Sequence, residues 1–219
     1  MAGGVRPGPV TSVVAMPADP EPLLAAARAD PAALGRLLEQ YRNYLRLLAR
    51  VELGRRLQGK VDASDVVQDA FLDAHRYFPN FRGTVEAQFV GWLREILAGT
   101  LANLVRRYVG TQARDVRLER EIAAGLDRSS VLLDRGLVAG GSSPSEQAAR
   151  HEQAVALADA LGGLPPDYRE AIVLRHLEGL TFPEVAARMG KSLDSVQKLW
   201  LRALAKLKQR LAGADGGDP

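Results

Sequence analysis

Residues 181–201 constrain the local fold more than any other run of this sequence. Thr181 and Glu184, three positions apart, have the spacing of a capping box, so a helix is expected to begin at this point. Gly190 follows the last helical position and can adopt the left-handed conformation that ends a helix in a tight turn. Ser192 is a suitable N-cap for a second helix. The run therefore predicts a helix-turn-helix.

The second of these helices is predicted to have one buried face and one exposed face. Its apolar side chains form a stripe at helical spacing, made of Leu193, Val196, Leu199, Trp200, Ala203, Leu204 and Leu207. The opposite face holds donors that suit base edges and phosphates in a major groove, namely Ser195, Gln197, Lys198 and Arg202. Each feature alone also fits an ordinary helical hairpin with a solvated basic face, and the combination favours DNA binding. Lys191 stands where an aliphatic residue is usual, so a weakly anchored turn is expected.

Charge is unevenly distributed over the last third of the chain. Residues 188–210 hold seven basic side chains and one acidic side chain, whereas residues 142–187 hold seven acidic and three basic ones. The formal net charge of the whole chain, +3, conceals this separation. The polarity predicts one face for phosphate and another face for a different partner.

The rest of the sequence also has a helical pattern, with abundant Ala and Leu, which lose little freedom in a helix. Asp62 is expected to cap a helix that ends before Pro79. The other predicted helices cover residues 31–53, 85–108, 145–161, 166–177, 182–189 and 193–211. The sequence therefore predicts an all-α fold of two small helical domains joined by a flexible linker.

Glycine, proline and serine mark the expected domain boundaries. Residues 1–20 are rich in Gly and Pro and are expected to form a disordered tail. A Gly-Gly-Ser-Ser-Pro run places the end of a linker at residue 144, and this linker, residues 113–144, is expected to hold a short helix near 116–125. The predicted domains are residues 21–112 and 145–211, followed by a tail at residues 212–219.

Several classes of function are disfavoured by what the sequence lacks. Cysteine is absent, which excludes disulfides and thiolate sites and fits a reducing cytosol. Neither a signal-peptide pattern nor a run of roughly 18 apolar residues is present, so a cytoplasmic protein without membrane spans is expected. Phosphate-binding loops, nucleophile elbows and metal-ligand spacings are also missing, so no enzyme, metal or cofactor is expected. The histidines, His75, His151 and His176, are expected to be ordinary helix residues.

Residues 161–179 and the segment that follows them resemble a known family. The run L-G-G-L-P-P-D-Y-R-E, continued by R-H-L-E-G, is similar to the start of region four in the extracytoplasmic-function group of sigma factors. The resemblance implies a domain that reads the minus-thirty-five promoter element and contacts the flap of the RNA polymerase β subunit. The DNA contacts that it implies lie at Ser192, Ser195, Gln197, Lys198 and Arg202.

A second match lies in the N-terminal half, where D-A-S-D-V-V-Q-D-A-F is similar to the region-two signature of the same family. It implies docking on the clamp helices of the polymerase β′ subunit through Asp62, Asp65, Gln68 and Asp69. With Asp73, the aspartates are spaced by three, four and four, which forms an acidic stripe opposite an apolar one. Such a stripe repels DNA and suits a basic protein surface. A merely solvated helix face is the alternative, and the second family match favours docking.

The F-R-G run and the W-L, I, N and R-R positions after it also resemble region two. The resemblance implies that the loop at residues 81–88 captures a flipped base of the minus-ten element and that the next helix contacts the displaced strand. Opening a duplex requires a surface that replaces lost stacking and supplies cationic groups. The implied contacts are Phe81, Arg82, Gly83, Thr84, Asn103, Arg106 and Arg107. Trp92 is expected in the core, and Gly91 and Gly99 are expected to weaken this helix.

The expected activity is therefore to direct core RNA polymerase to promoters, with each domain reading one DNA element. Contacts that are weak singly become strong when both domains are tethered to the polymerase, so the free protein is expected to bind promoter DNA poorly. An anti-sigma factor is a further partner that the resemblance allows. The main alternative is a free-standing helix-turn-helix regulator, which would bind paired half-sites as a dimer without polymerase. A nuclease that uses the aspartate stripe is a third reading.

Overall fold

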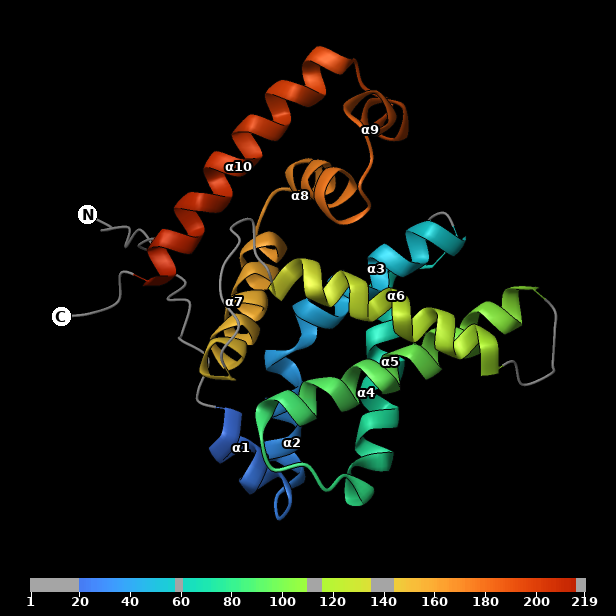
Figure 1. Ribbon diagram of the computed structural model, residues 1–219, viewed down its shortest axis with the longest axis vertical. Coiled ribbons are helices and arrows are strands. Elements are labelled where there is room, and N and C mark those ends of the chain that lie inside the picture. Colours follow the sequence, from blue (N-terminus) through green and yellow to red (C-terminus); the bar gives the residue numbers. More distant parts are fainter. Residues whose placement is uncertain (1–19, 58–60, 110–115, 135–143, 216–219) are drawn as a thin grey trace, which may run out of the picture.

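The computed structural model describes residues 20–57, 61–109, 116–134 and 144–215, and every regular element in these ranges is helical (Figure 1). This confirms the predicted all-α class for the described residues. The elements are α1 (Pro20–Ala27), α2 (Pro31–Gln40), α3 (Arg42–Leu57), α4 (Ala63–Tyr77), the 3-10 turn η1 (Phe78–Asn80), α5 (Glu86–Val109), α6 (Val116–Asp134), α7 (Pro144–Gly162), α8 (Pro166–Ile172), the π-helical turn η2 (Val173–Leu177), α9 (Phe182–Met189) and α10 (Leu193–Asp215). None of the described helices is long and apolar enough to cross a membrane.

The helix predicted over residues 31–53 is divided in two at Tyr41, which was not expected. Tyr41 is buried, and its hydroxyl donates a hydrogen bond of 2.8 Å to the carboxylate of Glu86 at the start of α5. Burial, with the Glu86 charge beside it, raises the pKa of Tyr41 far above its ordinary value, so the hydroxyl stays a donor. The spacing of apolar residues did not predict this break, because it continues from α2 into α3.

Helices α4 and α5 form the hairpin that carries most of the predicted N-terminal site. The Asp62 carboxylate accepts the Ser64 backbone N–H at 2.8 Å, which confirms the predicted cap of α4. Helix α5 continues without interruption through Gly91 and Gly99, so these glycines do not break it. Open space surrounds both positions, since a Cβ at either would meet no atom within 4 Å.

Helix α6 occupies much of the stretch that the sequence assigned to a linker. Its buried residues, Ile122, Leu126, Ser129, Ser130 and Leu133, form one stripe at helical spacing. The stripe lies on α3 and α5, and α6 crosses the middle of the molecule (Figure 1). A helix near residues 116–125 was expected, and the structure extends it to Asp134 because its apolar stripe continues that far.

Helices α7 to α10 form the C-terminal half, with the two crossed helices α9 and α10 at its outer end (Figure 1). Leu174, Val185, Ala186 and Val196 form a small apolar core beneath the turn between α9 and α10. A larger core is continuous from α1–α6 into α7, η2 and α10. The two halves are therefore in contact, with α7 lying against both α3 and α6.

Candidate DNA and polymerase interfaces

The predicted helix-turn-helix is present with its expected caps. The Thr181 backbone N–H donates to the Glu184 carboxylate at 2.7 Å, which is one half of the capping box. Gly190 ends α9 in the left-handed region, with φ 62°. The Ser195 backbone N–H donates to the Ser192 hydroxyl at 3.2 Å, so Ser192 caps α10. These local bonds fix the angle at which α10 leaves the turn.

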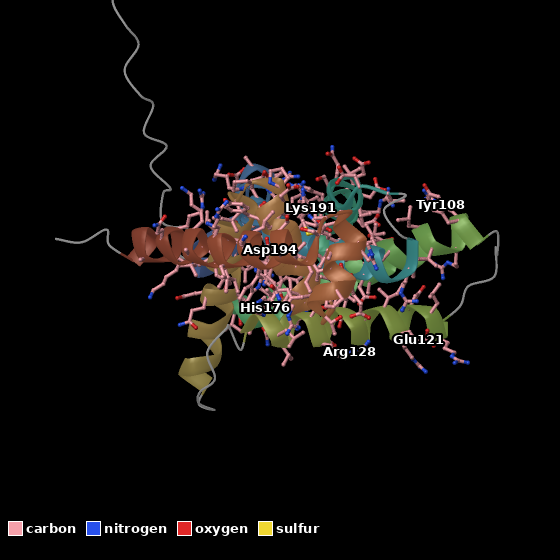
Figure 2. All side chains as sticks on the ribbon, turned by 90° about the horizontal axis from the view of Figure 1, so that it is seen from above. Tyr108, Glu121, Arg128, His176, Lys191 and Asp194 are labelled. Atoms are coloured by element: carbon pink, nitrogen blue, oxygen red, sulfur yellow. The ribbon has the colours of Figure 1, made fainter. Side chains whose placement is uncertain are left out.

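The five residues predicted to contact the minus-thirty-five DNA are all exposed, one just before α10 and four along its first three turns. Val196 below them is fully buried and anchors the helix. Lys198 is held by an ion pair of 2.8 Å with Asp194, which is weak because both side chains are well exposed. Viewed onto α9 and α10, Lys191 and Asp194 lie over the centre of the molecule (Figure 2). The exposed set is Ser192, Ser195, Gln197, Lys198 and Arg202.

Two details of α10 differ from the sequence-based expectation. Leu193 was predicted to be buried, but 44% of it is exposed, because it starts α10 ahead of the turn that Val196 anchors. Lys191 was expected to anchor the turn poorly, but its ammonium forms an ion pair of 3.0 Å with Asp167 of α8. The first turn of α10 therefore presents an apolar side chain among polar ones.

His176 was expected to be unremarkable, yet it contacts α10 directly. The Trp200 indole N–H donates to His176 Nε2 at 3.1 Å, and the two rings stack. Burial, aided by the positive charge of Arg175, lowers the pKa of His176 below its ordinary value. The acceptor role requires a neutral ring, so this bond links α10 to η2 only when His176 is unprotonated. No sequence signal marked this contact.

The acidic stripe predicted on α4 is present on its exposed side. Asp65, Gln68 and Asp69 are exposed, whereas Asp62 is engaged as the helix cap. Its bonds to Ser64 lower the pKa of Asp62 below its usual range. Leu72 lies one turn further along and is 61% exposed, which the sequence analysis missed. Leu72 therefore lies beside the stripe, one helical turn from Gln68 and Asp69.

The loop at residues 81–88 is held in a fixed shape, but Phe81 does not belong to its outer surface. Phe81 is only 9% exposed, and its ring packs against Phe78, Phe89 and Trp92, in agreement with the expected core position of Trp92. The ring therefore packs beneath the loop, and its contact with DNA stays a prediction. Arg28, in the turn directly after α1, donates to the carbonyl oxygens of Phe81 and Gly83 at 3.5 and 2.5 Å.

The remaining loop residues keep polar groups at the surface. Arg82 is exposed and donates to the Pro79 carbonyl at 2.8 Å, and the Thr84 backbone N–H donates to the Gln88 side chain at 2.9 Å. A Cβ at Gly83 would collide with the Phe81 ring, so this position requires glycine. The shape of the loop is therefore fixed by Arg28, which follows α1, and by hydrogen bonds of Arg82 and Gln88.

The end of α5 brings Asn103, Arg106 and Arg107 onto neighbouring turns, although not all of them are free. Arg107 and Asn103 are exposed. Arg106 is mostly buried, donates to Asn103 and forms an ion pair of 3.2 Å with Glu119 of α6. Its guanidinium is therefore engaged by Glu119 and Asn103 in the free chain, and its contact with the DNA strand stays a prediction. Tyr108 is exposed beyond them at the far end of α5 (Figure 2).

The described residues contain no group of three or more His, Asp or Glu side chains that could hold a metal ion. The aspartates of α4 are spread along one helix face and do not converge on a point. This arrangement suits a charged docking surface better than the nuclease reading.

Two family models match the chain, "Sigma-70 region 2" over residues 40–111 and "Sigma-70, region 4" over residues 154–207. The ECF RNA polymerase sigma-E factor of Haemophilus influenzae is 28% identical over 182 residues, which cover 83% of this chain and 89% of that protein. The RNA polymerase sigma-H factor of Pseudomonas aeruginosa is 31% identical over 151 residues, or 68% and 73% of the two chains. The structure of CnrH in complex with the cytosolic domain of CnrY is 26% identical, covers 88% of this chain and 97% of its own, and has a TM-score of 0.32.

The two matches fall on the two halves that carry the acidic helix and the helix-turn-helix, in that order. Together they span more than half of the sequence. The chain is therefore an extracytoplasmic-function sigma factor of the sigma-70 family, which directs RNA polymerase to promoters in the initiation of DNA-templated transcription.

Proposed function

We propose that this sigma factor divides its work among three surfaces. The exposed face of α4 docks on the β′ clamp helices of core polymerase, the loop at residues 81–88 with the end of α5 binds the minus-ten element, and the start of α10 reads the minus-thirty-five element. The observation that supports this division best is the contrast in exposed charge between α4, which is acidic, and α10, which is basic.

The docking surface consists of Asp65, Gln68, Asp69 and Leu72 on α4. An exposed leucine within a ring of charged and polar groups is the usual form of an interface centre, because burial of the apolar group supplies affinity while the rim supplies specificity. Asp62 lies at the edge of this surface and mainly caps the helix. Two aspartates would pair with basic side chains of the clamp and accelerate association at low salt.

The minus-ten surface consists of Arg82, Gly83 and Thr84 in the loop, with Asn103 and Arg107 on α5. Phe81 and Arg106 act behind this surface, Phe81 by packing the loop and Arg106 by holding Asn103. A loop already fixed by Arg28 loses little freedom when an extruded base enters it. This preorganisation supports a role in stabilising the melted strand.

The minus-thirty-five surface consists of Ser192, Ser195, Gln197, Lys198 and Arg202. The N-terminal residues of a recognition helix contact base edges in the major groove, and arginine and lysine further along contact guanine or phosphate. Region 4 would also contact the β flap, and an anti-sigma factor would compete for the polymerase-facing surfaces. The factor would work in the cytoplasm, where core polymerase is found, and without catalysis of its own.

Charge reversal tests the docking assignment. Asp65→Arg combined with Asp69→Arg should abolish co-purification with core polymerase and run-off transcription, since two repulsive charges replace two attractive ones. Glu39→Arg combined with Glu121→Arg makes the same change in net charge on α2 and α6 and should leave both readouts intact. Wild-type binding of core by the α4 variant would contradict the assignment. A free-standing regulator would instead bind its site tightly without polymerase.

A further inference from the structure

A cavity that none of the three proposed surfaces uses lies between α3, the start of α4 and the C-terminal helices α8 and α9 (Figure 1). Its volume of about 640 Å³ falls within the range of about 300–1,000 Å³ that is typical of small-molecule sites. Leu53, Val61 and Ala63 form an apolar part of its wall, and charged side chains form most of the rest. The cavity therefore has the size and the mixed lining of a ligand site.

Positive charge gathers at this cavity from three helices. Arg46 and Arg50 lie one helical turn apart on α3 and share one face. Burial, then the charges of Arg169 and Arg46, lower the pKa of Arg50, so these three guanidinium groups are electrostatic neighbours. Arg188 of α9 adds a fourth cation to the lining. An anion placed in the cavity would therefore be attracted by several like charges that otherwise repel one another.

The three carboxylates at the cavity are already engaged. Glu170 of α8 forms an ion pair with Arg50. Glu178 lies 3.9 Å from the guanidinium of Arg188, and only 8% of its side chain is exposed. Asp62 caps α4 with its carboxylate. The carboxylates thus compensate two of the four arginines, and the charge of the other two is left for a ligand.

Arg46 is the cation with the strongest need for a partner. It is half-buried, and no group in the described ranges of the chain forms a hydrogen bond or an ion pair with it. Arg169 beside it donates to three backbone carbonyl oxygens, which carry no net charge. A charged group that loses part of its water is costly unless an opposite charge compensates it. Arg46 and Arg169 together can compensate a ligand with about two negative charges.

We propose that this cavity binds a small organic phosphate of the size of a mononucleotide, with Arg46 as the principal phosphate ligand. The planar guanidinium groups of Arg46 and Arg50 can each donate paired hydrogen bonds to phosphate oxygens. Glu178 can accept a hydrogen bond from a hydroxyl or amino group of the organic part, and Leu53 and Val61 can contact its ring. Binding at this cavity does not depend on the three surfaces proposed above.

Charge and volume both favour a phosphate monoester over other anions. A phosphate monoester carries a charge of about −1.5 to −2 at pH 7, which matches the two arginines that no carboxylate compensates. The carboxylates in the lining would repel a ligand with a larger negative charge. A free phosphate ion takes up only a few times the volume of a water molecule, which is about 30 Å³, so it would leave most of the cavity to water.

Isothermal titration calorimetry of the full chain with adenosine monophosphate tests the site. The wild type should bind this nucleotide, and Arg46→Gln should weaken the affinity by at least about tenfold, the usual effect of removing a hydrogen bond between charged groups. Arg36→Gln is the matched control, because it removes the same charge from an exposed position on α2 and should leave the affinity unchanged. No binding by the wild type at about 1 mM nucleotide, or equal weakening in both variants, would overturn the proposal.

Adenosine and inorganic phosphate test the two parts of the ligand separately. Each should bind at least about tenfold more weakly than adenosine monophosphate, since each makes only part of the contacts. Adenosine that binds as tightly as the nucleotide would overturn the assignment of Arg46 to a phosphate. Inorganic phosphate that binds as tightly would overturn the organic part of the ligand.

A second variant and a thermal melt keep the test decisive if Arg46→Gln does not fold. Arg188 is exposed on α9, so Arg188→Gln should keep the fold and should also weaken nucleotide binding. Saturating adenosine monophosphate should raise the Tm of the wild type, because a ligand that binds only the folded chain stabilises it. An unchanged Tm, or full affinity in Arg188→Gln together with Arg46→Gln, would overturn the proposal.

Discussion

Replacement of Gly190 tests how the turn between α9 and α10 is built. Gly190 has φ 62° and ψ 33°, and its N–H donates to the Ala187 carbonyl at 3.3 Å. The left-handed conformation costs a residue with a Cβ about 1–2 kcal/mol. A Cβ at this position would meet no atom within 4 Å, so the backbone alone determines the cost. Alanine also restricts the unfolded chain by about 0.4–1 kcal/mol, which leaves Gly190→Ala destabilising by about 1 kcal/mol.

Guanidinium unfolding followed by far-UV circular dichroism measures this change. In a thermal melt followed by the same signal, 1 kcal/mol corresponds to a shift of about 2–4 °C in Tm for a unit of 150–250 residues, the size of this continuous core. Gly99→Ala is the matched control, because its Cβ also meets open space but its backbone is already helical. The control should stabilise the protein by about 1 kcal/mol. Shifts of the same sign in both variants would refute the argument from backbone conformation.

Three further predictions follow from single contacts. Leu126→Ala should lower the free energy of unfolding by about 3 kcal/mol, since Leu126 is a fully buried residue of α6. A loss below about 0.5 kcal/mol in denaturant titration would mean that α6 is a loosely packed linker. Burial lowers the pKa of His176 in the folded protein below the value of about 6.5 in the unfolded chain. The contribution of His176 to stability is therefore complete above about pH 6.5 and is lost as the pH falls through the folded-state pKa. The free energy of unfolding, measured at about pH 7.5 and about pH 5.5, should show this loss in the wild type and a smaller loss in His176→Gln. The exposed Leu193 should contact a thymine methyl group of the promoter. Replacing that thymine with deoxyuridine should weaken transcription about fourfold in the wild type and leave transcription by Leu193→Ala unchanged. Equal sensitivity of the two proteins would refute the contact.

Local chemistry made the capped helices predictable from the sequence. Thr181, Gly190 and Asp62 act through bonds to residues two to four positions away, so spacing alone reveals them. The exposure of the α4 aspartates and of the α10 donors followed in the same way from helical period. The exposed faces that we propose as the docking and minus-thirty-five surfaces were therefore predicted before any tertiary contact was known.

Tertiary contacts explain the rest of the site, and no spacing rule encodes them. Phe81 is buried because Phe78, Phe89 and Trp92 converge on it, and Arg106 is engaged because α6 returns over α5. The same return of α6 turned an expected linker into part of the core. In each case another element covers a face that a single helix would present to solvent. The periodicity of a helix does not predict which other element will pack on that face.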